Sequence, residues 1–478
     1  MISQKTDQIK KYLTKNRENF IKISDFIYEH PELRFIEYES AEYLAKACEN
    51  AGFTVERGVA NIKTSFVATY GHGSPVIGFL GEYDALSGLG QVANKTVQKP
   101  DGKANGHGCG HNLLGTASFA AACATKDFLM KNNLSGTVKF FGCPAEEGGS
   151  GKTFMVREGV FDDVDIALTW HPGDTNSIIS MSSLANYQVY FKFEGVSSHA
   201  AASPHLGRSA LDAVELMNTG VNYLREHIIP EARIHYAVTN TGGFSPNVVQ
   251  AEAEVLYLIR APEIKQVDEI YERVIKIAEG AALMTETEMT MKFDKACSNY
   301  IPNRSLEKIL YNKLLDSTIE QLTEEEIQFA KKLWESLTPH EKKSFLNSSK
   351  NFGDSIYENI SKGRYLADFV SPYEPIERPM AGSTDVADVS WVVPTAQLSA
   401  ATCALGTPGH SWQMTTQGKS SFAHKGMLRA AEAMAKTATH LFQNENDFKK
   451  VRDEFISFRD ENSYTCPIPD DVQPTILE

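Results

Sequence analysis

Hydrophobic residues in the first part of the chain recur with two periods, one typical of helices and one typical of strands. Three stretches have apolar side chains at helical spacing: residues 6–29, about 38–51 and about 113–131. Four short apolar runs predict strands: residues 62–70, 75–81, 137–143 and 164–170. Helices and strands in this order are typical of an α/β fold with a mostly parallel open sheet and helices on both faces.

The pattern changes from about residue 185. Strand-like runs and helical stretches follow at 187–193, 208–226, 234–239, 252–260, 262–282 and 286–293. The order β-α-β-β-α-β is that of a ferredoxin-like unit, which is a compact domain in its own right. We therefore expect residues 185–297 to form a lid or dimerisation domain, inserted between residues 1–184 and 298–478 of a catalytic, metal-binding domain.

Residues 303–365 are charged and have helical spacing. Within this segment Thr323 with Glu326, and Thr338 with Glu341, have the spacing of capping boxes. The pattern predicts a solvated helical insertion in the catalytic domain, and a surface for a partner is the alternative.

The last part of the chain contains one more apolar run and one more amphipathic stretch. Residues 390–403 are apolar and β-like, and residues 425–442 predict a final helix. The sequence after Asn444 is polar, so we expect a tail that is only partly ordered.

Composition excludes several classes of function. The 478 residues carry a formal net charge of −14, which argues against a nucleic-acid binder because such proteins need a basic surface. Seven cysteines without framework spacing indicate free thiols in a reducing compartment. The N-terminus has no apolar signal core, and no run of 18 apolar residues exists, so neither secretion nor a membrane span is expected. We expect a cytoplasmic protein.

Polar residues follow the predicted strands where each one ends. Asp84 follows residues 75–81, Glu146 and Glu147 follow 137–143, and His171 follows 164–170. Ligands of open parallel sheets bind outside the carboxyl ends of the strands, so these side chains are expected to converge.

Five residues of types that bind metals fall in or near this predicted edge: Cys109, His111, Glu147, His171 and His410. Five ligands are too many for one catalytic zinc, which favours two metal ions that share a water at ~3.5–4 Å from each other. Because adjacent glutamates point in different directions, one of the pair can bind metal while the other serves as general base.

Blander interpretations exist for each residue. Cys109 could be a small buried hydrophobe, His171 a core-edge histidine, and the glutamate pair ordinary surface charge. An apolar strand that runs into Glu-Glu-Gly-Gly is not typical of a solvated face, however. Residues 148–153 resemble the end of a phosphate-binding loop, but Glu146 stands where its leading glycine is required. No G-x-S-x-G nucleophile motif is present.

Six motifs occur in a familiar order. They are His-Pro-Glu-Leu at 30–33, Gly-Cys-Gly-His at 108–111, Pro-Ala-Glu-Glu at 144–147, Ser-Ser-His-Ala-Ala-x-x-Pro at 197–204, Asn247-Val248-Val249 with Arg260, and Gly382-Ser383-x-Asp385. From about residue 20 to 440 the chain resembles the dinuclear metallo-amidohydrolases of the aminoacylase/carboxypeptidase type.

The resemblance implies a role for each matching residue. Cys109, His111, Glu147 and His171 match metal ligands, and His410 suits the last ligand, with His424 as the alternative. Glu146 matches the general base, and Asp84 the acid that orients a ligand. His199 resembles a histidine that reaches into the partner's active site in a dimer and stabilises the oxyanion. Asn247, Arg260, Ser383 and Thr384 are expected to contact substrate.

The chain departs from the family pattern at two places. Many relatives read Cys-Gly-His-Asp-x-His, where this chain has Asn112 and Leu114. Many also have a glutamate in place of Thr384. We expect the first change to alter the support of the metal ligands and the second to alter the substrate pocket.

The resulting functional hypothesis is a hydrolase that cleaves the amide bond of N-acyl or N-aroyl amino acids. The lead substrate is p-aminobenzoyl-glutamate, which would give p-aminobenzoate and glutamate. A dipeptidase or general aminoacylase on the same site is the first alternative, and a non-catalytic subunit of a hetero-oligomeric hydrolase is the second. Two divalent ions per subunit, Mn²⁺ or Zn²⁺, are expected, in a homodimer or with a homologous second subunit.

Overall fold

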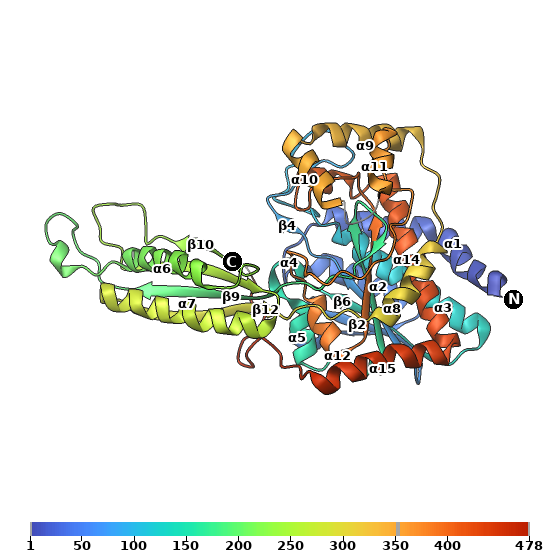
Figure 1. The fold of residues 1–478 in the computed structure, drawn as a ribbon, viewed down its shortest axis with the longest axis horizontal. Helices are drawn as coiled ribbons and strands as arrows, with labels where there is room; N and C mark the ends of the chain where they lie inside the picture. Colours follow the sequence, from blue (N-terminus) through green and yellow to red (C-terminus); the bar gives the residue numbers. More distant parts are fainter. Residues whose placement is uncertain (1, 350–353, 477–478) are drawn as a thin grey trace.

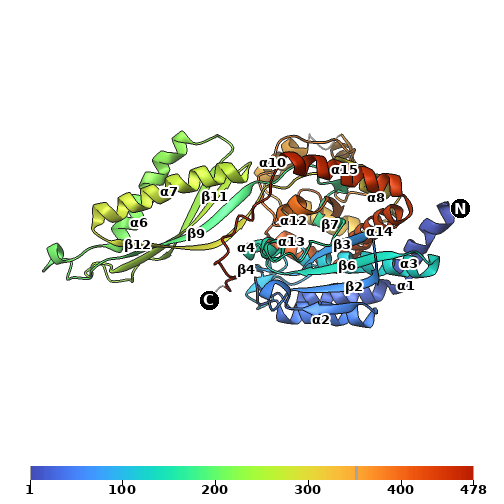
Figure 2. The same cartoon turned by 90° about the horizontal axis from the view of Figure 1, so that it is seen from below.

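The computed structural model describes residues 2–349 and 354–476, and it consists of two lobes (Figure 1). The larger lobe contains the open α/β sheet, and the smaller lobe extends from one side of it (Figures 1 and 2). No helix in the described ranges is long and apolar enough to cross a membrane. All seven cysteines are free thiols.

A seven-stranded sheet forms the centre of the larger lobe, in the order β1-β2-β6-β3-β7-β13-β8. Its strands are β1 (Thr54–Arg57), β2 (Phe66–His72), β3 (Val76–Glu82), β6 (Gly136–Cys143), β7 (Ile166–Gly173), β8 (Ser177–Ile178) and β13 (Thr395–Ala401). The four strands β6, β3, β7 and β13 are parallel, and the outer strands are antiparallel to their neighbours. The predicted mostly parallel sheet is confirmed.

Helices cover both faces of this sheet, as the alternating pattern predicted. On one face lie α1 (Ile2–Glu29), α2 (Tyr38–Asn50), α3 (His111–Asn132), α8 (Arg304–Leu315) and α14 (Ser421–Gln443). On the other face lie α5 (Gly151–Arg157) and α12 (Val386–Val392). The short elements are η1 (Val59–Asn61), β4 (Leu86–Ser87), β5 (Asn105–Gly106), α4 (Glu146–Gly149) and α13 (Trp412–Gln417).

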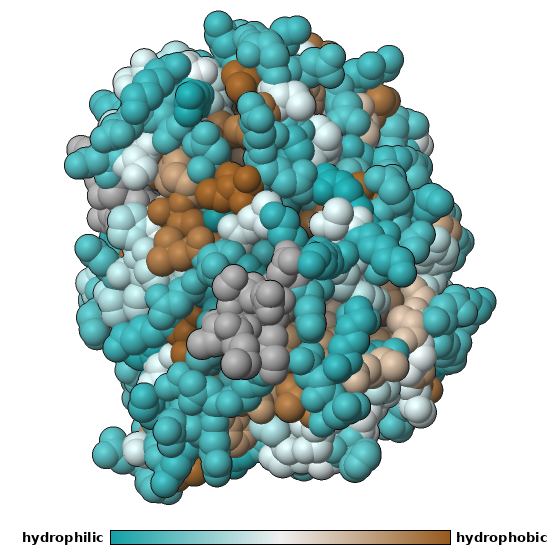
Figure 3. Space-filling model, turned by 90° about the vertical axis from the view of Figure 1, so that its right-hand side faces the viewer, coloured by the Kyte–Doolittle hydropathy of each residue, from teal (hydrophilic) through white to brown (hydrophobic). Residues whose placement is uncertain are grey.

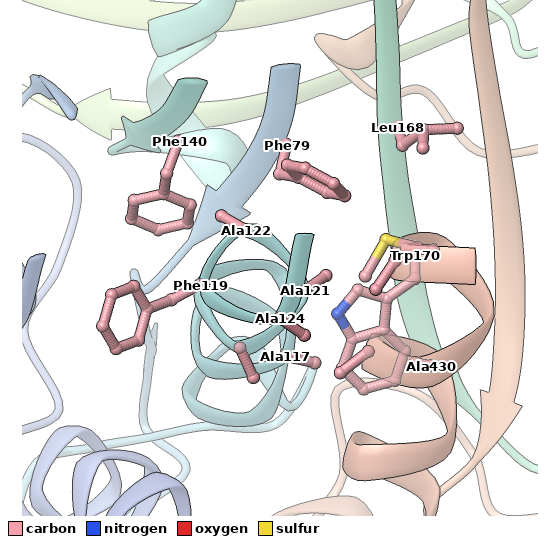
Figure 4. Packing of buried hydrophobic residues seen from close by; sticks show 14 of the residues in the cluster. Phe79, Ala117, Phe119, Ala121, Ala122, Ala124, Phe140, Leu168, Trp170 and Ala430 are labelled. Atoms are coloured by element: carbon pink, nitrogen blue, oxygen red, sulfur yellow. The ribbon is translucent and has the colours of Figure 1, made fainter. Parts of the chain in front are cut away.

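The Ala-rich helix α3 lies at the centre of the main core. Ala117 and Ala121 of α3 face Trp170 of β7 and Ala430 of α14 (Figure 4). Because alanine side chains are small, α3 and α14 pack closely around the fully buried Trp170 indole. The indole nitrogen donates a hydrogen bond to the Leu114 carbonyl at 3.0 Å. This packing fixes the start of α3, and therefore His111, relative to the sheet edge.

The smaller lobe contains a four-stranded antiparallel sheet in the order β10-β11-β9-β12. Its elements are β9 (Ala185–Glu194), η2 (Pro204–Leu206), α6 (Ala210–Leu224), η3 (Arg225–His227), β10 (Arg233–Asn240), β11 (Glu252–Ala261), α7 (Ile264–Thr285) and β12 (Glu288–Cys297). Helices α6 and α7 lie on the same face of this sheet (Figure 2). The expected domain boundaries at 184/185 and 297/298 stay a prediction.

The helical insertion contains α9 (Glu324–Ser336), α10 (Pro339–Ser349) and α11 (Ser355–Ser361). The prediction of a solvated insertion over 303–365 was wrong for α8, because its leucines are buried in the main core beside the sheet. Both predicted capping boxes are present: Glu326 N–H bonds the Thr323 hydroxyl, and Glu341 N–H bonds the Thr338 hydroxyl, each with the reciprocal bond. A small apolar cluster that includes Leu333 holds the insertion to the lobe.

Two other local predictions were wrong. Residues 390–392 end helix α12 and do not begin a strand, because a short apolar run suits a buried helix as well as a strand. The sequence after Asn444 forms helix α15 (Glu445–Glu461) and is not a loose tail. Asn444 caps this helix through the Asp447 N–H, and Val451 is fully buried.

The end of the larger lobe that faces away from the smaller one is mainly hydrophilic, with scattered hydrophobic residues (Figure 3). Such a surface is typical of a face in contact with water. The chemistry-bearing residues lie elsewhere, near the junction of the lobes.

Candidate metal centre and substrate cleft

The polar residues predicted at the strand ends meet at one edge of the large sheet. Asp84 follows β3, and Glu146 and Glu147 begin α4 directly after β6. His171 lies near the end of β7, and His111 is the first residue of α3. Since β6, β3 and β7 are parallel neighbours, their carboxyl ends lie side by side. This edge lies where the two lobes meet (Figures 1 and 2).

The five candidate ligands form two groups that share Cys109. Cys109, His111 and His171 make one group, and Cys109, Glu147 and His410 make the other, with the ligand atoms of each within 4.8 Å of one another. The Cys109 Sγ lies 3.4 Å from His171 Nε2, and His410 Nε2 lies 3.3 Å from Glu147 Oε2. Two adjacent groups with one bridging residue have the form of a dinuclear site.

Asp84 orients one ligand from each group. Its Oδ1 lies 2.8 Å from His111 Nδ1, and its Oδ2 accepts the Glu147 backbone N–H at 2.8 Å. The remaining ligand atoms, His111 Nε2 and Glu147 Oε1, are buried 3.9 Å apart and have no hydrogen-bond partner among the described residues. Buried polar atoms rarely lack a partner, so these two fit a bound cation.

The adjacent glutamates have opposite electrostatic surroundings. Burial, then the charges of Glu82 and Glu147, raise the pKa of Glu146 well above its usual range. Burial also opposes ionisation of Glu147, but the hydrogen bond with His410 and the charge of His111 lower its pKa to about 2. Glu147 is thus the carboxylate suited to hold a cation, and Glu146 the one suited to take up a proton.

Unusual backbone conformations surround these side chains. His410, Ala145 and Ser150 have φ angles of 53°, 61° and 55°, in the left-handed region that non-glycine residues rarely adopt. The buried Glu37 carboxylate holds the Ala145 turn by accepting its N–H at 2.9 Å. Such conformations cluster at functional sites, where the surrounding structure imposes them.

The structure separates the two candidates for the last ligand. His410 lies against Glu147, as described above, and its N–H donates to the Gly108 carbonyl at 3.0 Å. His424 lies in α14 and pairs with Asp25 at 3.1 Å, outside every candidate metal group among the described residues. His410 therefore stays the ligand that we infer.

A cavity of about 390 Å³ opens beside the candidate ligands. Arg260, Ser383 and Thr384 line it together with Glu146, as the sequence led us to expect. Arg260 donates to the Ser383 hydroxyl at 3.2 Å, and its Nε has no partner among the described residues. The Thr384 hydroxyl accepts the Val386 N–H at 3.3 Å. A guanidinium with an unused donor in a cavity suits a carboxylate ligand.

A buried lysine that the sequence did not single out lies below this cavity. Lys152 Nζ is 2.7 Å from Glu82 and 2.6 Å from Asp385, and all three side chains are almost fully buried. Burial disfavours the charged lysine, but the charges of Asp385 and Glu82 raise its pKa. Glu82 also lies 3.3 Å from His111. Lys152 was part of the rejected phosphate-loop match, and it serves instead to neutralise two carboxylates beside the metal centre.

His199 and Asn247 do not line the cavity of their own chain. Both are exposed in the smaller lobe, where the segments 197–200 and 247–249 are hydrogen-bonded to each other. The His199 Nδ1 accepts the backbone N–H groups of Ala201 and Ala202. The two motif residues thus lie together on a surface of the lobe, away from the metal centre of this chain.

Two neighbours of the Cys109 motif have supporting contacts. His107 is buried, and its Nε2 lies 3.0 Å from the Ile27 carbonyl. Asn112 donates to Ser24 and to the Gly418 carbonyl, at 3.0 Å each. Where many relatives have an aspartate, Asn112 therefore ties α3 to α1 and to the end of α13.

A second cavity, of about 330 Å³, adjoins the first. His171, Ile179 and Met380 line both cavities. Phe345 of α10 and Ile356 of α11 also line the second one, so the helical insertion forms part of its wall. It therefore offers an apolar surface next to the metal centre.

The family is shown by comparison with known proteins. The family model of peptidase family M20/M25/M40 matches residues 78–338, and the chain belongs to this family. The expected class is confirmed: the chain is a metal-dependent amidohydrolase, and a non-catalytic role is not favoured.

Particular relatives are also similar over most of their length. One of the subunits of the p-aminobenzoyl-glutamate hydrolase of Escherichia coli (strain K12) is 53% identical over 468 residues, which cover 97% of each chain. The Xaa-Arg dipeptidase of Mus musculus is 29% identical over 79% of this chain and 73% of its own. A crystal structure of an aminobenzoyl-glutamate utilization protein from Klebsiella pneumoniae superimposes with a TM-score of 0.61 at 17% identity, over 91% of this chain and 98% of the other. This last similarity shows a shared fold.

Proposed function

We propose that this enzyme hydrolyses the amide bond between an aroyl group and an amino acid, with p-aminobenzoyl-glutamate as the lead substrate. One observation carries the proposal: Glu146 lines one cavity together with Arg260 and with four of the five candidate metal ligands, Cys109, Glu147, His171 and His410. The Nε of Arg260 has no hydrogen-bond partner among the described residues. The substrate named for the relative that is 53% identical supports this choice.

The metal centre that we propose consists of Cys109, His111, Glu147, His171 and His410, which would hold two divalent ions. When bound, such ions lower the pKa of water and polarise the carbonyl group that is attacked. A thiolate with three imidazoles suits Zn²⁺, and a carboxylate ligand also suits Mn²⁺.

Proton transfer is the task of Glu146. In the cavity its carboxylate takes the proton of the attacking water and then delivers it to the nitrogen of the leaving amino acid. Asp84 holds His111 and the Glu147 backbone in place during both steps, through the two 2.8 Å contacts described above.

The two cavities suit the two halves of such a substrate. Arg260 binds the α-carboxylate of the amino acid, next to Ser383 and Thr384. The aroyl ring occupies the second cavity, where Ile179, Met380 and Phe345 offer apolar surface. The scissile carbonyl then lies near His171, which lines both cavities.

The active oligomer that we propose is a dimer through the smaller lobe, either of identical chains or with a homologous second subunit. In it, His199 and Asn247 of one chain complete the cavity of the other, because neither reaches its own cavity. His199 would stabilise the oxyanion that forms as water attacks.

A dipeptidase or general aminoacylase is the second candidate, because a relative 29% identical to this chain is an Xaa-Arg dipeptidase. A preparation with measured Mn²⁺ and Zn²⁺ content separates the two through kcat/KM for p-aminobenzoyl-glutamate and for a panel of acyl amino acids and dipeptides. Our proposal predicts the highest value for p-aminobenzoyl-glutamate. Preference for dipeptides of any composition would contradict it.

A further inference from the structure

A second cation lines the substrate cavity and has no hydrogen-bond or ion-pair partner among the described residues. Lys295 of β12 is half-buried there, and its side chain makes no hydrogen bond or ion pair with any described residue. Arg260 of β11 also lines this cavity, and no carboxylate among the described residues pairs with it. Charges are seldom left unpaired away from bulk water, so two unpaired cations in one cavity indicate a ligand with two negative charges.

A β-bulge gives Lys295 this position. The register between β12 and β9 shifts between Phe293 and Lys295. As a result Lys295 lies opposite Gln188, and no residue of β9 lies opposite Asp294. Two residues further on, Cys297 pairs with Asn186, which also pairs with Arg260. Because alternate residues share a face, the bulge places Lys295 on the face that carries Cys297 and lines the cavity.

The nearby carboxylates are all engaged elsewhere or lie beyond the reach of Lys295. Asp294, next to it in the chain, is buried in a bidentate ion pair with Arg34 at 2.8 and 3.1 Å. Asp385 is held by Lys152, and Glu147 by His410. Glu146 is not within 4.0 Å of Lys295, the limit for an ion pair. The positive charge of Lys295 therefore remains available to a ligand.

We propose that Lys295 determines specificity by binding the side-chain carboxylate of an acidic amino acid, while Arg260 holds its α-carboxylate. The inference rests on the proposed function and deepens it, because it selects N-acyl glutamate and similar N-acyl dicarboxylates over neutral N-acyl amino acids. A charged hydrogen bond in a cavity is strong enough to give such a preference.

The test compares p-aminobenzoyl-glutamate with p-aminobenzoyl-glutamine, in which an uncharged amide replaces only the side-chain carboxylate. The wild type should favour the glutamate compound in kcat/KM by roughly 10- to 100-fold. Lys295→Gln should remove this preference by raising KM for the glutamate compound, with kcat and the glutamine compound changed by less than about twofold. Lys295→Arg should retain the preference, and Lys292→Gln, an exposed change on the same strand, should have no effect.

Two results would overturn the role of Lys295. One is an equal loss on both substrates, which would indicate a general effect on the site, and the other is a wild type without preference. If the wild type cleaves neither compound, the proposed substrate fails, and calorimetric binding of L-glutamate and L-glutamine decides on Lys295. Tighter binding of glutamate that is lost in Lys295→Gln supports its role, and equal binding of the two contradicts it.

Discussion

Buried charged residues around the metal centre are neutralised by one another and not by water. Glu82, Lys152 and Asp385 form a buried chain of alternating charge, and Glu82 continues it to His111. An ion removed from such a chain leaves its partners charged and out of contact with water. The stability of this part of the molecule and the position of His111, a metal ligand under our proposal, are therefore linked through Lys152.

Replacement of Lys152 tests this link. Lys152→Met should lower the free energy of unfolding by about 3–5 kcal/mol, because Glu82 and Asp385 lose their shared cation. Urea denaturation followed by circular dichroism measures the change. Lys450→Met is the control, since Lys450 is 70% exposed and should alter stability by less than about 0.5 kcal/mol. A change in Lys152→Met as small as in the control would show that the charge chain is unimportant.

Sequence reasoning identified residues whose meaning depends on their chain neighbours. Cys109, His111, Glu147 and His171 each adjoin a predicted strand or helix end, so their convergence could be predicted from the parallel sheet. Lys152 could not be assigned in this way, because its partner Asp385 is 233 residues away. Lys295 was missed for a related reason: a bulge, which leaves no clear signal in the sequence, decides which residue of β12 lines the cavity.

At the level of elements, helix α12 joins three segments beneath the substrate cavity. Its Asp388 accepts hydrogen bonds from the Thr153 hydroxyl of α5, the Ser298 N–H after β12 and the Tyr464 hydroxyl after α15. The apolar run at 390–403 did not predict this helix, and the polar sequence beyond Asn444 did not predict α15. Both form because tertiary contacts, such as the burial of Val451, outweigh local pattern.

The stability of this junction should depend on pH. Burial raises the pKa of Asp388 from 3.8 to about 6. The folded state thus binds the proton of Asp388 more tightly than the unfolded state. The contribution of this proton to the free energy of unfolding is therefore complete below pH 3.8 and is lost as pH rises through 6. Between pH 4 and 7, the wild type should lose on the order of 2–3 kcal/mol relative to Asp388→Asn, which does not titrate.

Urea denaturation of both proteins at a series of pH values measures this difference. Two curves of stability against pH that run parallel would contradict the assignment of the effect to Asp388. The other titratable groups are the same in both proteins, so their contributions to the pH dependence of stability cancel in the comparison.

For the whole molecule, the separation of the lobes explains why one chain does not contain a complete site under our proposal. The cavity lies at the junction of the two lobes. His199 and Asn247 are exposed in the smaller lobe and do not line this cavity. The sequence motifs led us to expect a role in the partner's site for His199 alone, and Asn247 was expected only to contact substrate. Whether the second subunit is an identical chain or a homologous one depends on how the chains assemble, and no local sequence pattern predicts it.

Mixed dimers test the shared site. A dimer with Glu146→Gln in one chain and His199→Ala in the other has one complete site, although both parent proteins should be inactive. Co-expression with two affinity tags isolates this species, and it should have about half of the wild-type kcat, as one of two sites is intact. A mixed dimer as inactive as its parents would show that each chain uses its own His199.

The central claim is that Glu146 is the general base beside a metal centre. That centre is formed by Cys109, His111, Glu147, His171 and His410. The most direct measurement compares Glu146→Gln with the wild type for bound metal and for turnover of p-aminobenzoyl-glutamate in the same preparations. The variant should keep its metal content and lose on the order of 10²- to 10⁴-fold in kcat. Glu335→Gln, an exposed change on α9, should match the wild type in both respects. Wild-type kcat in Glu146→Gln would contradict the claim.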